Sequence, residues 1–320
     1  MKNIEILPKD DGFQDCGLVC AANEARFTSS HYSEPLTAFT VGWKDSEKIE
    51  ELLNFVAPAV PVSRRFEFKV ADNSEPFLSE TDDIRSIGSA FKRIEFAGTS
   101  VTSKTYNKGL TIRVDHDDVA GDDWRERYVQ LLLQRLYRNE LRRAVSALSG
   151  NANSQNYAWS NSTGTPNPDS DIRQELEAAT NATGVRPNRI IFGEGAWDIR
   201  SDAYDRQNNA GSNRAAGLSL DELARKLFVD EVRVMGARYQ DASSKTAILG
   251  NEIYAFFAKS EIMKDEPANI KRFITPVDGG SAFRVYVDEH SKFSDVTVEH
   301  YSNIVITSAT GIRKLVVSAG

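Results

Sequence analysis

The stretch "VDHDDVAGDDW", residues 114–124, holds five aspartates and one histidine, side chains that could bind a metal ion for hydrolytic chemistry. A metal site needs ligands that converge on one ion from several directions. Neighbouring residues at a strand end point to alternate faces. Asp115, His116, Asp117 and Asp118 therefore cannot all reach one ion, and their spacing does not match a calcium-binding loop.

The same acidic residues suit the entrance of a helix, because a long helical pattern follows them. Free N–H groups and the positive end of the helix dipole favour carboxylates at that position. We therefore expect Asp117, Asp118, Asp122 and Asp123 to stabilise the start of the helix. A metal-dependent hydrolase that uses residues 115–118 stays open as an alternative.

A second motif, "IIFGEGAWD" at residues 190–198, is similar to the glycine fingerprint of dinucleotide-binding folds. Asp198 stands where the third glycine belongs and would bring negative charge towards a phosphate, so a tight strand-to-helix turn is expected instead. The four histidines are scattered, and no phosphate-binding loop, zinc-protease or serine-hydrolase motif occurs. We expect no catalytic, metal-binding or cofactor-binding residues, and hence no enzyme.

The composition is that of an ordinary globular protein with a formal net charge of −7, which argues against a free nucleic-acid-binding protein. No apolar run reaches the length of a membrane span, and the N-terminus shows no export signal. The two cysteines, Cys16 and Cys20, lie in "CGLVC" without a second cysteine or histidine pair, which is a poor zinc signal.

The strongest helical pattern covers residues 122–148, which predicts a helix close to 40 Å long. Between residues 124 and 148 six arginines stand against two glutamates, so the helix is locally basic. Arginine suits planar, bidentate partners. These arginines could be solvated, could touch nucleic acid, or could pair with carboxylates of another subunit.

Two strand patterns predict a long two-stranded ribbon. "RRFEFKV" (64–70) alternates apolar and charged residues, and "SVTSKTYNKGLTIRV" (100–114) is rich in residues that favour strands. Some thirty polar residues separate them, far more than a hairpin turn requires. An isolated two-stranded ribbon is marginal in water, so we expect a surface outside the monomer to cover it.

The rest of the chain predicts further elements. A helix is expected at 45–56, a boundary loop around 149–171, helices at 171–182, 195–207 and 219–228, and a strand at 188–192. The last residues contain mainly strand patterns: "FRVYV", "DVTVEHY", "NIVIT" and "RKLVV".

This order of elements resembles the major capsid proteins of tailed bacteriophages, the Hong Kong 97-like fold. The resemblance rests on a polar arm before "FVAPAVPVSRRFEF", on "TIRVDHDD" entering the long helix, on "PNRIIFGEGAWDIRSDAYD", and on the strand-rich tail. It implies an α+β chain with an N-terminal arm (1–62), an extended β-hairpin loop (63–115), a peripheral domain with a long spine helix (116–165 and 266–308) and an axial α/β domain (166–265 and 309–320).

The resemblance implies that the extended loop lies over a neighbouring subunit. The sequence offers these candidate inter-subunit contacts: Phe66, Phe68, Lys104, Lys108, Arg138, Arg142 and Arg143. Some members of the family join the loop to the peripheral domain by a lysine–asparagine isopeptide bond. Lys92, Lys104 and Lys108 lie in the loop, but Ser294 and Asp295 stand where the asparagine is expected, so solvated lysines are expected here.

The resemblance implies hexamers and pentamers that build an icosahedral phage head around double-stranded DNA without sequence-specific binding. The expected partners are other copies of the chain, a portal, and scaffold or cement proteins, with no membrane. The expected location is the virion, after synthesis in the host bacterial cytoplasm. A shell protein of a bacterial encapsulin compartment is the alternative with the same fold.

Overall fold

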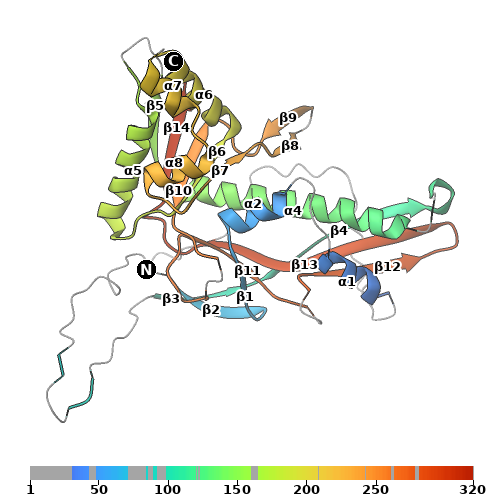
Figure 1. Cartoon of the computed structure of the whole chain (residues 1–320). Coiled ribbons are helices and arrows are strands. Elements are labelled where there is room, and N and C mark those ends of the chain that lie inside the picture. Colours follow the sequence, from blue (N-terminus) through green and yellow to red (C-terminus); the bar gives the residue numbers. More distant parts are fainter. Residues whose placement is uncertain are drawn as a thin grey trace.

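A computed structural model describes residues 31–42, 48–70, 84–85, 89–91, 99–119, 121, 123–159, 165–207, 209–241, 243–260, 263–277 and 281–319 (Figure 1). Most of the expected N-terminal arm lies outside these residues, as do both cysteines and Lys92. None of the helices in the described ranges has the length and apolar character of a membrane span.

The helices are α1 (Glu34–Gly42), α2 (Ile49–Val56), α4 (Trp124–Asn151), α5 (Pro168–Thr183), α6 (Glu194–Asp205), α7 (Ala210–Ala216) and α8 (Leu220–Leu227), with a 3-10 turn η2 at His116–Asp118. The strands are β1 (Ala59–Pro61), β2 (Arg65–Val70), β3 (Thr99–Lys104), β4 (Tyr106–Asp115), β5 (Asn153–Ala158), β6 (Arg189–Gly193), β7 (Glu231–Met235), β8 (Arg238–Asp241), β9 (Ser244–Ala247), β10 (Glu252–Phe256), β11 (Ile270–Ile274), β12 (Phe283–Glu289), β13 (Phe293–Ile306) and β14 (Arg313–Ser318). Helices and strands alternate from α4 to α6, and only strands follow α8 in the described part of the chain.

The first five-stranded sheet is organised around the long strand β13. One edge of β13 pairs with β4. The other edge pairs with β12 and, further along β13, with β11, and β11 also pairs with β1. The long helix α4 crosses this sheet (Figure 1) and contributes buried residues such as Leu133, Leu141 and Leu148. Its 28 residues make it roughly 42 Å long.

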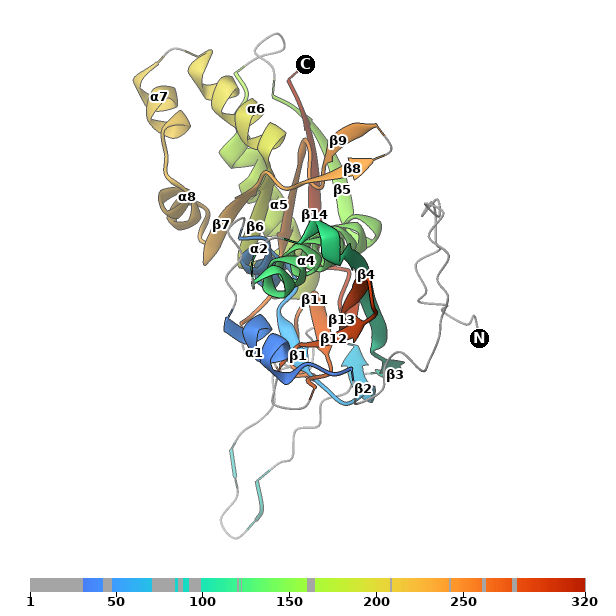
Figure 2. The ribbon, with the colours of Figure 1, turned by 90° about the vertical axis from the view of Figure 1, so that its right-hand side faces the viewer.

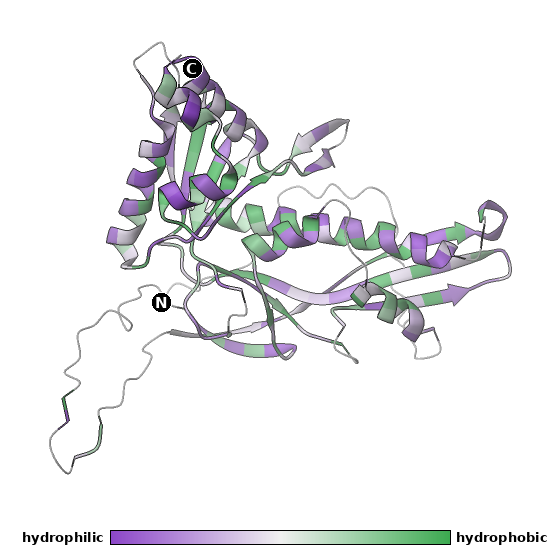
Figure 3. Ribbon diagram, viewed as in Figure 1, coloured by the Kyte–Doolittle hydropathy of each residue, from purple (hydrophilic) through white to green (hydrophobic). Residues whose placement is uncertain are grey.

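The second five-stranded sheet has the order β5-β14-β10-β6-β7, with parallel and antiparallel neighbours. The C-terminal strand β14 lies between β5 and β10, so it is an inner strand of this sheet. Figure 3 shows hydrophobic residues on its central strands and mainly hydrophilic residues on the surrounding helices. One face of this sheet has a core of its own that includes Ile172, Phe192 and Leu223, whereas Ile191 and Tyr254 belong to the core under α4.

Most of the predicted elements are confirmed, including the long helix and the strand-to-helix unit formed by β6 and α6. Three expectations are wrong. The boundary loop contains β5, which pairs in parallel with β14. The polar stretch after α6 forms α7, which begins with a capping box between Asn209 and Ser212. The patterns "DVTVEHY" and "NIVIT" belong to one strand, β13. The domain boundaries stay a prediction.

Candidate inter-subunit surfaces

The paired strands β2 and β3 form the base of the predicted ribbon, with Phe66 opposite Ser103 and Phe68 opposite Val101. Phe66 is 8% exposed and Phe68 is 1% exposed. Their ring centroids lie 4.4 and 5.2 Å from that of Phe273 on β11, within the same chain. The expectation that this part of the ribbon needs an external cover is therefore wrong, because an aromatic cluster of its own chain already buries it.

The return strand also differs from the expectation. It pairs with β2 only as far as β3, and the following strand β4 leaves the ribbon to pair with β13. Polar contacts fix the base of the ribbon at both strands. The backbone N–H of Lys69 donates to Oδ1 of Asp265 at 3.2 Å, and Nδ2 of Asn303 donates to the carbonyl oxygen of Lys104 at 3.0 Å.

The loop that contains Asp265 is itself held by a buried ammonium group. Nζ of Lys271 donates to the carbonyl oxygens of Met263 (3.3 Å), Lys264 (2.7 Å) and Glu266, and Lys271 is fully buried. Burial lowers the pKa of Lys271 from 10.5 to about 8. The charged form is therefore less favourable in the folded chain than in the unfolded chain.

We expect the lowered pKa of Lys271 to make the free energy of unfolding change with pH in the alkaline range. Between about pH 8 and 10.5 the unfolded state binds more protons at Lys271 than the folded state, so the free energy of unfolding should rise with pH by up to about 1.4 kcal/mol per unit. Urea unfolding below, within and above this window should show the rise in the native protein and lose it in Lys271→Met. Parallel pH curves for the two proteins would contradict this assignment.

Lys108 and Arg143, two of the candidate contacts, meet at one buried carboxylate. Oε1 of Glu140 on α4 accepts from Nζ of Lys108 at 2.8 Å and from Nη1 of Arg143 at 2.7 Å. Its Oε2 accepts from Oγ of Ser302 on β13 at 2.9 Å. Glu140 is 2% exposed. Lys108 and Arg143 thus have partners within their own chain, and that they also contact a neighbouring subunit stays a prediction.

The electrostatics of this centre favour an ionised Glu140. Burial raises the pKa of Glu140, but His300 and Lys108 outweigh it and hold that pKa well below its ordinary value. Burial lowers the pKa of Lys108 although Glu140 opposes the shift. Burial also lowers the pKa of His300, whose Nε2 lies 3.8 Å from Oε1 of Glu140. The centre therefore links α4, β4 and β13 through charged hydrogen bonds.

The other three candidates are Lys104, Arg138 and Arg142. Lys104 is exposed, and its Nζ lies 5.4 Å from the ring centroid of Tyr106. Arg142 is exposed on α4, and its guanidinium lies 4.0 Å from the ring centroid of Tyr239 on β8. Arg138 is half-buried. That these residues contact a neighbouring subunit stays a prediction.

The acidic stretch lies between β4 and α4, as the sequence predicts, but its side chains make contacts other than the expected ones. Asp115 accepts a hydrogen bond from the backbone of Asp117 at 3.0 Å and so caps η2. Nε2 of His116 lies 2.8 Å from Oγ of Ser294. Asp123 directly precedes α4, and its carboxylate pairs with Arg127 at 3.0 Å.

Asp123 thus occupies the expected N-cap position of α4, but its side chain makes no capping hydrogen bond, and Asp122 lies outside the described residues. Within the described ranges, no group of three or more histidine, cysteine, aspartate or glutamate side chains could hold a metal ion.

The glycine-rich turn at 193–195 is a close approach between two backbones, as expected from the missing third glycine. β6 runs directly into α6. A Cβ atom on Gly193 would lie 1.8 Å from the carbonyl oxygen of Gly250, and one on Gly195 would lie 2.1 Å from Oδ1 of Asn251. Gly193 therefore excludes any side chain, whereas a side chain at position 195 would require Asn251 to move.

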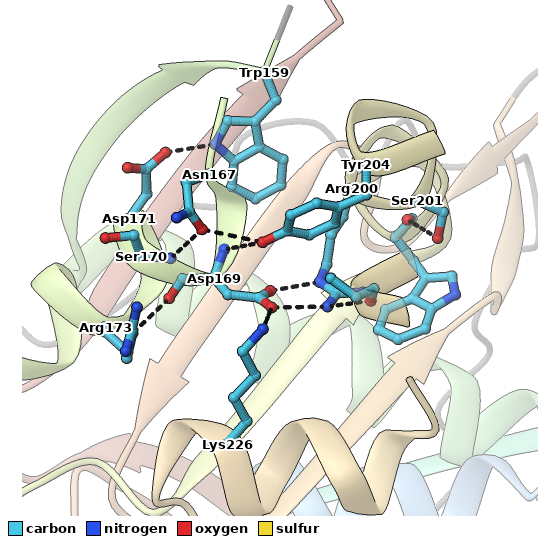
Figure 4. A network of polar contacts seen from close by, with 12 residues as sticks. Trp159, Asn167, Asp169, Ser170, Asp171, Arg173, Arg200, Ser201, Tyr204 and Lys226 are labelled. Carbon is cyan, nitrogen blue, oxygen red and sulfur yellow. Dashed lines mark hydrogen bonds and ion pairs between the residues drawn. The ribbon is translucent and has the colours of Figure 1, made fainter. Parts of the chain in front are cut away.

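One buried ionic network was not predicted from the sequence (Figure 4). Asp169 at the start of α5 accepts from Nε of Arg200 at 2.8 Å and from Nζ of Lys226 on α8 at 2.7 Å. Both Asp169 and Arg200 are fully buried. Burial raises the pKa of Asp169, but the two cations outweigh it and lower that pKa. The network therefore joins the helices α5, α6 and α8 beside the second sheet.

The position of Arg200 among apolar residues of the sequence could have predicted its burial. Arg200 shares a helix face with Ala196, Ala203 and Tyr204, all of which are buried. An arginine on an apolar face indicates a buried carboxylate partner, although periodicity alone does not identify which one.

No family model matches the sequence, and no curated protein matches it. The fold is similar to that of a phage-related protein from Bordetella bronchiseptica RB50, with 18% identity, a TM-score of 0.66 and coverage of 89% of this chain and 96% of that one. It is also similar to a solved structure of Microbacterium phage Oxtober96, with 11% identity, a TM-score of 0.50 and coverage of 83% and 90%.

The capsid structure of the cyanophage P-SCSP1u matches with 6% identity, a TM-score of 0.49 and coverage of 83% and 87%. These likenesses extend over most of each chain, so they concern the whole architecture. The chain has an α+β fold of the Hong Kong 97-like capsid type, and the fold class expected from the sequence is confirmed.

Proposed function

We propose that this protein is the major capsid protein of a tailed bacteriophage, a structural protein without catalysis. Copies assemble as hexamers and pentamers into an icosahedral head that encloses double-stranded DNA. The observation that carries the proposal is the likeness to a phage-related protein over 89% of this chain at a TM-score of 0.66.

The arrangement of the chain supports this role. Side chains of α4 and of both sheets share one hydrophobic core, and the ribbon base has a smaller core of its own with β11 of the first sheet. The proposed inter-subunit contacts are Lys104, Lys108, Arg138, Arg142 and Arg143, whereas Phe66 and Phe68 are buried against Phe273 of their own chain.

The proposal also includes the partners and the location of the shell. A portal and scaffold or cement proteins are its expected partners, and the virion is its expected location after synthesis in the host bacterial cytoplasm. The net charge of −7 suits a container, because phosphate binding grows with each cation that a protein presents. A shell of this charge encloses DNA without holding it tightly.

Sedimentation velocity tests the proposal. The purified protein should form capsomers, tubes or shells of megadalton mass as its concentration rises. A single species of about 36 kDa at every concentration, salt and pH tested would contradict the proposal, since the chain has a mass of 35.6 kDa.

The contents of the particles distinguish a phage head from an encapsulin compartment. Particles recovered from infected or induced cells should contain double-stranded DNA that resists nuclease until the shell is opened. An enzyme cargo in place of DNA would assign the chain to the encapsulin type of shell.

A further inference from the structure

Phe228 combines two unfavourable features in the described part of the chain. It follows the last residue of α8 with a φ of 55°, in the left-handed region that favours glycine. Its side chain is 78% exposed, more than most large apolar side chains in the described part of the chain. Backbone strain and an exposed aromatic ring at one position indicate a functional surface.

The backbone under this ring is held firmly. Nη2 of Arg186 donates to the carbonyl oxygen of Leu227 at 2.8 Å, and its Nε donates to that of Phe228 at 3.3 Å. The N–H of Val229 donates to the carbonyl oxygen of Ala224 at 3.0 Å and closes the helix end. The backbone at Phe228 is therefore fixed and needs little ordering when the ring binds.

A cavity of about 520 Å³ lies at the other end of the same helix. Leu220, the first residue of α8, lines it together with Ile49 and Leu52 of α2 and Val234 of β7. A cavity of roughly 150 Å³ with apolar walls is enough to hold a benzene molecule. The cavity beside α2 therefore has room for a phenyl ring.

The backbone at this cavity shows a second outlier. Lys48 lines the cavity with a φ of 55°, and among the described residues other than glycine only Lys48 and Phe228 have a positive φ. The two strained positions thus mark the projecting ring and the cavity.

We propose that Phe228 of one copy inserts into this cavity of the next copy, an inference that rests on the proposed shell function. Ring and cavity lie at opposite ends of an eight-residue helix, roughly 12 Å apart along its axis. Figures 1 and 2 show α8 on the outer side of the second sheet, beside the edge strand β7. A patch that binds a different patch on the next copy makes a head-to-tail contact, and such contacts form rings when the rotation between copies closes.

Charge supports a second copy as the occupant. Arg225, in the last turn of α8, is an exposed cation near the projecting ring. Glu51 is an exposed carboxylate at the cavity. Arg233, which also lines the cavity, is already paired with Glu231. Arg225 of one copy can therefore meet Glu51 of the next, and opposite charges fix the register of such a contact.

The variant Phe228→Gly separates an interface role from a structural one. Glycine adopts the left-handed backbone freely and removes an exposed ring, so the thermal midpoint of the monomer should stay the same or rise. The concentration needed for assembly should rise at least about tenfold. Phe228→Tyr, which keeps the ring, should assemble at nearly the native concentration. Assembly of Phe228→Gly at the native concentration would overturn the inference.

Photo-crosslinking identifies the surface that the ring meets. p-Benzoylphenylalanine at position 228 keeps an aromatic ring in place, and assemblies mixed from ¹⁴N- and ¹⁵N-labelled chains reveal crosslinks between copies. Mass spectrometry should locate these crosslinks at residues 48–52 or 233–237. The same probe at position 131, where Leu131 is also exposed, should not crosslink there.

The two proposals fail in different ways. Native assemblies in which the crosslinks from position 228 lie elsewhere would overturn the ring-to-cavity contact and leave the shell function intact. A native chain that remains monomeric under all conditions would overturn both proposals.

Discussion

Glu140→Ala should lower the free energy of unfolding by about 3–5 kcal/mol, the range for removing one partner of a buried ion pair. Lys108 and Arg143 donate to this carboxylate at 2.8 and 2.7 Å, and Glu140 is 2% exposed. Without it, the ammonium group of Lys108 would stay buried with no compensating charge. Chemical denaturation of the two proteins measures the difference.

Glu140→Gln is the matched control, because it keeps the shape and one acceptor oxygen while removing the charge. It should cost less than Glu140→Ala. A loss below about 1 kcal/mol in Glu140→Ala, the range of a surface ion pair, would contradict the buried centre described above.

The same centre should contribute to acid sensitivity. The folded pKa of Glu140 is held well below its ordinary value of 4.5, so its ionisation stabilises the folded chain above that pH. The contribution is lost as the pH falls through the folded pKa. Glu140→Gln should therefore lose less stability than the native protein between neutral pH and acid.

Replacing residues 71–98 with the two-residue turn Asn-Gly should abolish closed shells while leaving the monomer folded. β2 and β3 pair as far as Val70 and Thr99, so a short turn can close the hairpin there. Phe66 and Phe68 hold its base against Phe273. Any large effect on assembly must then come from the removed segment and not from unfolding. Electron microscopy and thermal unfolding of the same preparation measure both quantities.

Phe68→Ala is the contrasting variant for this experiment. It removes a side chain that is 1% exposed, and it should lower the free energy of unfolding by about 3–5 kcal/mol. Normal particles from the chain with the shortened ribbon would remove the predicted extended loop from the assembly mechanism.

The sequence predicted those parts of the fold that depend on local pattern. The spacing of apolar residues in 122–148 predicts α4, and the alternation in 64–70 predicts β2, because side-chain periodicity decides which face is buried. β5 was missed since "NSQNYA" has no apolar alternation. Its strand conformation comes from pairing with β14, some 160 residues further along the chain.

The partners of the candidate contacts within the chain could not be predicted because residue type does not identify the partner. Lys108 and Arg143 have the chemistry of interface residues, and both also pair with Glu140 within the chain. Phe66 and Phe68 showed a covered face, but the covering residue, Phe273, lies about 200 positions away. In each case a tertiary contact between distant segments decided the outcome.

The central claim is that the chain is a shell subunit whose role is geometric, and electron cryomicroscopy of the purified native protein tests it most directly. Closed particles of uniform size should appear, and their reconstruction should show five- and six-membered rings into which the fold described here fits. Fields of single molecules at high concentration, or aggregates without icosahedral order, would contradict it.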